Sequence, residues 1–260
     1  MSGETPVVEY TVTAASRDRI YKERSAIIVE FPLEIEVNGR PTVHLLCTPE
    51  HLEELVTGFL YNEGLITSLD ELLQLKIGAG KAEVKIAGEF PDTEGGVPWL
   101  TSGCGRNIGW RGDKARNCIF EGRISSDMTV SPATVIDLML QLQRSPELYQ
   151  KTRGAHGAAL ADAKGLIIFR EDIGRHNAID KVAGALLHRK LETADKLLLT
   201  TGRISSEIVT KAARMGTPFL VSRSVPTDYA IQLGELLGIT LVGMARGPRF
   251  KVYTHEWRLA

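Results

Sequence analysis

Apolar residues in the first ninety positions alternate in the way that predicts strands joined by tight turns. Ser25 to Val37 and Thr42 to Cys47 read as two paired strands around Asn38-Gly39, a dipeptide typical of hairpin turns. Ala82 to Ile86 predicts a further short strand. These segments indicate a small sheet in the N-terminal part of the chain.

Helical spacing replaces this alternation after Cys47. Thr48 is placed to cap a helix that has Pro49 at its first position, and the apolar residues up to Leu60 then fall on one helical face. Gly64 predicts the end of this helix, and a second helix is expected over Leu69 to Leu75. Together with the strands, these helices make a small α+β unit.

The second half of the chain alternates between apolar strands and helices, after a capped helix from Ser131 through Gln143. The expected strands are Gly157 to Ala161, Gly165 to Arg170, Lys196 to Thr200, Pro218 to Ser222 and Thr240 to Gly243, and the expected helices are Asn177 to Leu187, Ser205 to Met215 and Thr227 to Leu237. Strands separated by helices of this length predict a largely parallel sheet that is covered on both faces.

A stretch rich in glycine and proline, Gly88 to Gly105, separates the two patterns and sets the expected domain boundary. We therefore expect a small α+β domain over residues 1–100, a cysteine-containing loop over residues 101–118 and a larger domain over residues 119–260. The fold class that follows is α/β, with a three-layer α/β/α arrangement in the larger domain.

Composition restricts the class of protein. Hydrophobic residues make up 43% of the 260 residues and charged residues 24%, as in ordinary globular domains. The 31 basic and 32 acidic residues nearly cancel, so the chain lacks the basic surplus of a nucleic-acid-binding protein. No apolar run is long enough to span a bilayer, and the first thirty residues lack the pattern of a signal peptide. We therefore expect a cytoplasmic protein that binds neither nucleic acid nor membrane.

The three cysteines are too few, and odd in number, for a disulfide-stapled fold, so any of them could be a working thiol. Cys104 stands between Gly103 and Gly105, and the arginines and lysine that follow favour the reactive thiolate. A buried, inert thiol is the alternative, and the flanking glycines argue against it. Cys47 ends an apolar strand and is expected in the core, whereas Cys118 fits either role.

Glycines and arginines gather directly after expected strands, where open α/β sheets bind ligands. Arg175 and His176 lie between a strand and a helix, where they could present donors to an anion. Arg203 and the segment Met244 to Arg249 follow two other apolar strands, and arginine suits phosphate. A phosphate-rich ligand is indicated, although the common phosphate-loop and dinucleotide fingerprints are missing. The alternative for these arginine-containing segments is that they are salt-bridged connections between strands and helices that bind no ligand. The alternative for His156 is a structural role.

Four segments carry a family resemblance. The longest is the run Glu171-Asp172-Ile173-Gly174-Arg175-His176-Asn177-Ala178-Ile179-Asp180-Lys181, and the others are Thr101 to Gly105, Gly58 to Gly64 and Thr200 to Ser205. In these segments the chain resembles the FdhD family, the formate dehydrogenase accessory sulfurtransferases. The resemblance runs from about Arg24 to Thr254, which is nearly the whole chain.

This resemblance implies a sulfurtransferase that works as a persulfide relay. A cysteine desulfurase would load sulfur onto Cys104, which would pass it to the molybdenum bis(molybdopterin guanine dinucleotide) cofactor, bound as a substrate and destined for formate dehydrogenase. A homodimer, no intrinsic metal and a larger domain resembling the cytidine deaminase fold are also expected. The cofactor-binding residues expected from the resemblance and from the sheet edge are Met244, Ala245, Arg246, Gly247, Pro248, Arg249, Arg203, Arg175 and His176.

One position departs from the family pattern. Many relatives carry Cys-Gly-x-Cys, whereas this chain has Asn107 in place of the second cysteine, so either Cys104 acts alone or Cys118 assists it. A chaperone that binds the cofactor without touching its sulfur is the alternative function. A zinc deaminase is a weaker alternative, because His156 is followed by Gly-Ala and the chain has no Cys-x-x-Cys. The choice between molybdenum and tungsten stays open.

Overall fold

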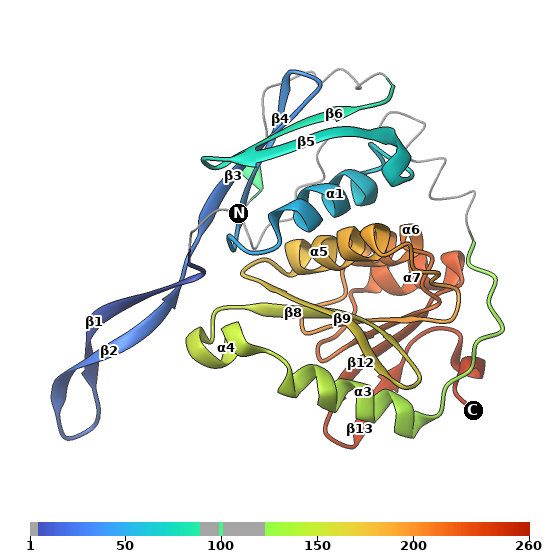
Figure 1. The fold of residues 1–260 in the computed structure, drawn as a ribbon. Helices are drawn as coiled ribbons and strands as arrows, with labels where there is room; N and C mark the ends of the chain where they lie inside the picture. The colour runs from blue at the N-terminus through green and yellow to red at the C-terminus, as the bar shows by residue number, and fades with distance from the viewer. Residues whose placement is uncertain (1–4, 89–98, 101–122) are drawn as a thin grey trace.

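The computed structural model describes residues 5–88, 99–100 and 123–260. It shows two sheets with helices packed between and around them, and a two-stranded ribbon that projects from the body (Figure 1). Cys104, Asn107 and Cys118, on which the predicted thiol chemistry depends, lie outside the described residues. Cys47 lies inside them and is fully buried, as its place at the end of an apolar strand predicted.

The larger sheet has six strands and a mixed pairing pattern. In spatial order they are β13 (Arg249–Val252), β12 (Thr240–Arg246), β11 (Phe219–Ser222), β10 (Leu197–Thr200), β8 (His156–Asp162) and β9 (Gly165–Asp172). β10, β11 and β12 are parallel, whereas β8, β9 and β13 pair antiparallel with their neighbours. The prediction of a largely parallel sheet therefore holds only at its centre, because β8 and β9 form a hairpin and β13 turns directly back from β12.

Helices cover both faces of this sheet. They are α3 (Pro132–Arg144), the short α4 (Glu147–Thr152), α5 (Arg175–His188), α6 (Ser206–Arg214) and α7 (Asp228–Leu237). α3 packs on one face of the sheet through one buried apolar cluster. α5, α6 and α7 pack on the other face through a second buried apolar cluster that they share. The layered α/β arrangement is thus the one that the alternation of strands and helices predicted. No helix in the described part of the chain is long and apolar enough to cross a membrane.

The smaller sheet has five strands and covers α1 (Leu52–Glu63) from the side opposite to α5 (Figure 1). Their spatial order is β5 (Leu72–Gly78), β6 (Lys81–Ile86), β3 (Phe31–Val37), β4 (Arg40–Cys47) and β7 (Trp99–Leu100). The predicted hairpin at Asn38-Gly39 is confirmed, since β3 and β4 pair antiparallel around it and the two residues have φ values of 51° and 79°.

Two predicted helix boundaries in this unit are wrong. Of the helix predicted over Leu69 to Leu75, only Leu69–Glu71 is helical, as a 3-10 turn. The strand β5 begins at the next residue, because its alternate residues face inward and it pairs with β6. α1 begins at Leu52 rather than at Thr48, because the Thr48 hydroxyl donates instead to Asp172, at 3.1 Å, across the molecule. Gly64, with a φ of 76°, ends α1 as predicted.

The projecting ribbon, called the arm below, consists of β1 (Val7–Ala15) and β2 (Ile20–Ile28). The sequence predicted a single strand from Ser25 to Val37, and this prediction is wrong. Residues 25–28 pair with residues 7–10 in the arm, and the chain then bends before β3 begins at Phe31. The partner strand β1 was not predicted, so the strand that ends at Ile28 could not be separated from β3.

Close contact between α1 and α5 holds the two units together. A Cβ atom added at Gly58 would lie 1.8 Å from the carbonyl oxygen of Asp180, and one added at Gly184 would lie 1.9 Å from that of Glu54. The two helices therefore cross backbone against backbone, at a distance that only glycine permits. The domain boundaries expected from the sequence stay a prediction.

We predict that Gly184→Ala lowers the free energy of unfolding by about 1–3 kcal/mol or more, because α1 and α5 must move apart to admit the methyl group. The higher helix propensity of alanine offsets only about 1 kcal/mol of this loss. Urea unfolding of the variant against Gly78→Ala gives the comparison, since a Cβ at Gly78 meets no atom within 4 Å. Equal stability of the two variants would contradict the close helix crossing.

Candidate functional site

The carboxyl ends of the three parallel strands meet at one edge of the larger sheet, called the carboxyl edge below. β10, β11 and β12 end there at Thr200, Ser222 and Arg246. The start of β8 and the end of β9 lie at the same edge, because His156 pairs with Asp172 and β8 runs antiparallel to β10. Edges of this kind are where open α/β sheets bind ligands.

Arg175 lies against the loop that follows β10. A Cβ atom at Gly202 would come within 2.8 Å of the Arg175 Cδ, so the stem of the arginine packs directly on the glycine. The Gly202 carbonyl also accepts a hydrogen bond of 2.5 Å from the Ser222 hydroxyl. This glycine therefore brings the start of α5 and the ends of β10 and β11 together.

The loop that follows β11 connects the end of β12 to the end of β10. The backbone N–H of Met244 donates to the Ser224 carbonyl at 2.7 Å, and the Arg246 Nε donates to the Arg223 carbonyl at 2.8 Å. The backbone N–H of Arg223 in turn donates to the Thr200 carbonyl at 3.3 Å. Arg246 is thus linked through one loop to the strand that precedes Arg203.

The residues predicted for cofactor binding fall into three groups. Arg203, Arg246 and Arg249 are exposed at the carboxyl edge, as are Met244 and the turn residues Gly247 and Pro248. Ala245 is buried, and Met244 has a φ of 54°, a left-handed conformation that is uncommon for a residue other than glycine. Arg175 and His176 are half-buried at the start of α5.

The sequence reasoning missed Arg223, which follows β11 as Arg203 follows β10. It is half-buried, and its carbonyl holds Arg246 in place. The signal was present in the sequence, since Arg223 comes directly after the predicted strand Pro218 to Ser222. With Arg223, five arginines stand at the carboxyl edge, and guanidinium groups suit a ligand rich in phosphate: Arg175, Arg203, Arg223, Arg246 and Arg249.

Burial lowers the pKa of the two histidines at this edge. Burial, followed by the charge of Arg175, lowers the pKa of His156, whose Nδ1 lies 3.2 Å from the Thr201 hydroxyl. Burial also lowers the pKa of His176, whose Nε2 lies 3.0 Å from the Glu207 carboxylate. The positive charge of the edge therefore comes from its arginines. Within the described residues, no group of three or more His, Cys, Asp or Glu side chains is placed to hold a metal ion.

A buried carboxylate ties the carboxyl edge to the smaller unit. Asp172 is fully buried, and its Oδ1 accepts hydrogen bonds from the Gly174 backbone N–H and the Asn177 side-chain amide, both at 2.9 Å. Its Oδ2 accepts from the backbone N–H of Thr48 at 3.0 Å. Asn177 also donates to the Leu46 carbonyl at 2.8 Å. Asp172 and Asn177 thus fix the start of α5 against the end of β4.

Lys181 completes this network with a fully buried ammonium group. Its Nζ lies 2.7 Å from the Asp172 Oδ2 and donates to the Thr48 hydroxyl oxygen at 2.6 Å. The Glu171 carbonyl accepts a third, longer bond of 3.3 Å. A charge removed from water needs partners of this kind, so the pair is stable only while both units are in place.

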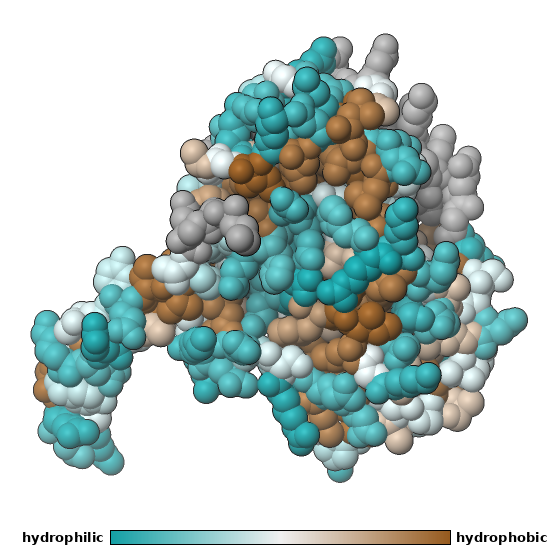
Figure 2. Space-filling model, in the orientation of Figure 1, coloured by the Kyte–Doolittle hydropathy of each residue, from teal (hydrophilic) through white to brown (hydrophobic). Residues whose placement is uncertain are grey.

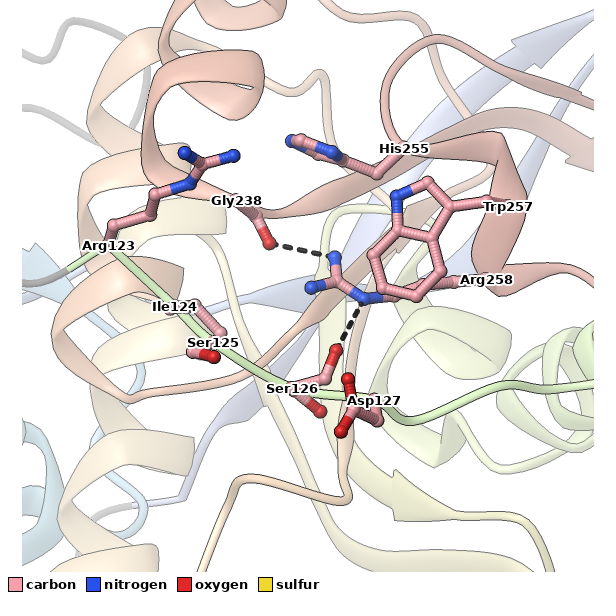
Figure 3. A pocket seen from close by; sticks show the side chains of 9 residues that line it. All are labelled: Arg123, Ile124, Ser125, Ser126, Asp127, Gly238, His255, Trp257 and Arg258. Atoms are coloured by element: carbon pink, nitrogen blue, oxygen red, sulfur yellow. Dashed lines mark hydrogen bonds between the residues drawn. The ribbon is translucent and has the colours of Figure 1, made fainter.

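A separate pocket of about 440 Å³ lies at the opposite edge of the sheet (Figure 3). Its lining residues are Arg123, Ile124, Ser125, Ser126, Asp127, Gly238, His255, Trp257 and Arg258. Arg258 is buried and donates to the carbonyls of Ser126, at 3.1 Å, and Gly238, at 2.8 Å, so it holds the segment that follows Arg123 onto the sheet. These contacts explain Arg258 as a structural residue, and we do not place the candidate site in this pocket.

Comparison with known proteins relates this architecture to one family. Residues 28–260 match the model of the FdhD/NarQ family. The sulfur carrier protein FdhD of Bacillus subtilis (strain 168) is 39% identical over 246 residues, which cover 92% of this chain and 92% of that protein. The sulfur carrier protein FdhD of Geobacillus kaustophilus (strain HTA426) is 40% identical over 249 residues, with 93% and 92% covered.

A solved structure agrees in fold. The crystal structure of a candidate formate dehydrogenase accessory protein from Desulfotalea psychrophila is similar over 98% of this chain and 100% of that chain, with a TM-score of 0.80 and 25% identity. The similarity therefore extends over both sheets and not over the larger domain alone.

We predict that Asp172→Asn lowers the free energy of unfolding by about 3–5 kcal/mol, because it leaves Lys181 as a buried charge without its counter-ion. Lys181→Met should lower the free energy of unfolding by a similar amount. The double variant should lower it by clearly less than the sum of the two single losses. Denaturant unfolding of the four proteins as a double-mutant cycle measures this coupling. Additive losses would show that the two groups do not act as a pair.

Proposed function

This chain belongs to the FdhD/NarQ family, as its four sequence segments predicted, and from that premise we propose that it is a sulfurtransferase for formate dehydrogenase. Cys104 accepts sulfur as a persulfide from a cysteine desulfurase. The sulfur then passes to the molybdenum bis(molybdopterin guanine dinucleotide) cofactor, which the protein binds as a substrate. The observation that carries the proposal is the placement of five arginines at the carboxyl edge of a chain whose named relatives are sulfur carriers.

The carboxyl edge suits the phosphate groups of such a substrate. Arg203 and Arg246 are exposed, and Arg223 lies between them on the loop that binds both strand ends. Gly202 is buried under the stem of Arg175, and its lack of a side chain lets this arginine pack close to the end of β10. Because burial lowers the pKa of both nearby histidines and so favours their neutral forms, guanidinium groups supply most of the attraction for an anion.

The loading step needs only one thiol on this chain. The Cys104 thiolate attacks the outer sulfur of the desulfurase persulfide, a new S–S bond forms at Cys104, and the desulfurase cysteine leaves as its own thiolate. Atoms and charge balance in this exchange without an external oxidant. A second cysteine at the position of Asn107 is therefore not required for loading, and Cys118 is the alternative acceptor within the same segment.

The remaining expectations belong to the same proposal. The protein acts in the cytoplasm as a homodimer, it works with a cysteine desulfurase and a formate dehydrogenase, and it holds no metal of its own. Its larger domain has the layered arrangement of the cytidine deaminase fold, without the residue pattern of a zinc deaminase. The competing function is that of a chaperone, which would bind the same cofactor at the carboxyl edge but would not depend on Cys104.

We predict that the purified chain gains one sulfur atom on Cys104 when it is incubated with a cysteine desulfurase and cysteine. Intact-protein mass spectrometry with peptide mapping measures the gain, which a thiol reductant should remove. Cys104→Ala should abolish both loading and activation of formate dehydrogenase, whereas the matched control Cys118→Ala should keep both. Cys47 serves as an internal control, because burial raises its pKa and keeps it as an unreactive thiol.

Two other outcomes would change the assignment. Loading confined to Cys118 would move the carrier to that residue, which is the alternative that Asn107 leaves open. A Cys104→Ala protein that still activates formate dehydrogenase would favour the chaperone, since that function needs the arginines but no thiol.

We predict that Arg223→Ala weakens the binding of guanosine diphosphate, as a probe of the cofactor, by about tenfold or more, because a charge-assisted hydrogen bond is worth about 1.5–3 kcal/mol. Titration calorimetry against Arg189→Ala tests this, since Arg189 is exposed just after the last residue of α5, at the end opposite to Arg175. Unchanged affinity in Arg223→Ala would remove this arginine from the binding site.

A further inference from the structure

His176 and Glu207 form a closely spaced pair at the carboxyl edge and are called the acid–base pair below. Hydrophilic residues are spread over much of the face shown in Figure 2, so exposed charge alone marks no single site on it. The acid–base pair is different because it is mostly buried: the His176 Nε2 lies 3.0 Å from the Glu207 Oε2, and the two side chains are 17% and 22% exposed. Titratable groups that the protein shields from water in this way are common at functional sites.

Two helix starts hold the acid–base pair in place. His176 is the second residue of α5 and Glu207 is the second residue of α6, and each helix begins a few residues after a strand that ends at the carboxyl edge. The Nε2 atom of His176 is enclosed, yet it makes no aligned hydrogen bond. The contact with Glu207 is therefore incomplete while the ring is neutral, and protonation of both ring nitrogens would turn it into an ion pair.

Lys211, a buried cation of α6, is already bound to another carboxylate. Its Nζ donates to both carboxylate oxygens of the buried Asp180, at 2.6 Å and 2.7 Å, and lies 4.0 Å from the Glu63 Oε1. Burial raises the pKa of Glu207, but the contact with His176 and nearby positive charges lower it by more, so this group is a carboxylate. A carboxylate whose neighbouring lysine is bound elsewhere favours a positive charge on His176.

Positive charge at the carboxyl edge opposes that protonation in the free protein. Burial lowers the pKa of His176, the contact with Glu207 raises it, and two positive charges lower it again, those of Lys211 and Arg175. The titratable and charged groups that face the acid–base pair come from four elements: Arg175 of α5, Lys211 of α6, His156 of β8 and Glu63 of α1. An anion bound at this edge offsets the charge of Arg175 and thereby raises the pKa of His176.

We propose that His176, held beside Glu207, takes up a proton when the phosphate groups of a ligand bind at the carboxyl edge. This role rests on the proposed function, which supplies the anionic ligand. The proton comes from water, and the imidazolium that forms is paired with the Glu207 carboxylate while it adds positive charge to the edge. His176 therefore adjusts the charge of the site to its ligand, beside arginines whose charge is fixed.

His156 stands at the same edge but lacks a partner of this kind. Its Nδ1 lies 3.2 Å from the Thr201 hydroxyl, which is neutral. Burial lowers the pKa of His156, and the Asp172 carboxylate, which opposes this shift, is already paired with Lys181. His156 is thus a matched control, because it is a second histidine of the carboxyl edge for which the described structure shows no carboxylate at ion-pair distance.

The test counts the protons taken up when diguanosine diphosphate binds, a dinucleotide in which a diphosphate joins two guanosines. Its phosphates are diesters and keep the same charge throughout the range in which histidine titrates, so an uptake of protons is assigned to the protein. Titration calorimetry at about pH 6 in MES and in Bis-Tris, two buffers that differ in ionisation enthalpy, gives the number of protons. Because binding raises the pKa of His176, the affinity should be greatest at low pH and should fall as the pH rises.

We expect the wild type to take up a measurable fraction of a proton, and its Kd to rise about threefold to tenfold from about pH 5.5 to about pH 7.5. The rise begins below the ordinary histidine value of 6.5, because the pKa of His176 is lowered in the free protein. His176→Gln should abolish the uptake and flatten the pH profile. Glu207→Gln should shift the rise to lower pH, because the imidazolium loses its carboxylate, and His156→Gln should leave both uptake and profile unchanged.

A direct reading of the His176 pKa avoids reliance on the variants alone. The carbon-13 histidine signal that is missing in His176→Gln is titrated by NMR in the wild type, and its pKa should rise when the dinucleotide binds. Urea unfolding shows that the variants are folded.

Four results would overturn this role and leave the proposed transfer in place: binding without proton uptake, uptake that persists in His176→Gln, uptake that is lost in His156→Gln, or a Glu207→Gln profile equal to that of the wild type. If the dinucleotide does not bind at all, the proposed ligand site at the carboxyl edge is wrong, and the role of His176 is wrong with it. Sulfur loading on Cys104 is measured separately, so the two failures are distinguishable.

Discussion

The buried pair of Asp172 and Lys181 is the interaction on which the rest of the structure depends. Both side chains are fully buried, and each is completed by groups from the other unit or from the start of α5. A buried ion pair adds little stability compared with apolar residues of the same size. Removing one of its partners, however, strongly lowers the stability, because the other charge is then buried without a counter-ion. The pair therefore specifies one arrangement of the two units, in which β4 ends against β9, and penalises other arrangements.

That arrangement places α5, and α5 in turn places the carboxyl edge. Gly58 and Gly184 let α1 and α5 cross in backbone contact, and a second buried pair, Asp180 with Lys211 at 2.6 Å, fixes α5 to α6. Arg175, the first residue of α5, then packs its stem against Gly202. Arg175 and Arg246, which we propose to bind phosphate, thus stand on a helix and at the end of a strand, and such elements hold a side chain more precisely than a loop does.

Local patterns were enough to predict the central strands and helices of the larger domain, because the strands are mostly apolar and the helices include two with side-chain caps, Ser131 and Thr227. They failed where a partner distant in the sequence decides the structure. Thr48 has the pattern of an N-cap, yet its hydroxyl goes to Asp172, 124 residues away. The apolar residues of Leu72 to Gly78 fit either a helix or a strand. The segment forms a strand because it pairs with β6. The arm was missed because β1 and β2 are mostly exposed, so they lack the buried apolar positions that mark a strand on a core.

The site was predictable to the extent that strand ends could be found. Arg203 and Arg246 follow strands that the sequence identified, and Arg223 could have been found by the same rule. The thiol is a different case, because sequence alone leaves three cysteines. Burial removes Cys47, whose thiol is fully enclosed and has its pKa raised, as a candidate for exchange with another protein. If this chain carries sulfur on a cysteine, the carrier is therefore in the segment that contains Cys104 and Cys118, while the carboxyl edge is the part of the described structure where we propose that the acceptor binds.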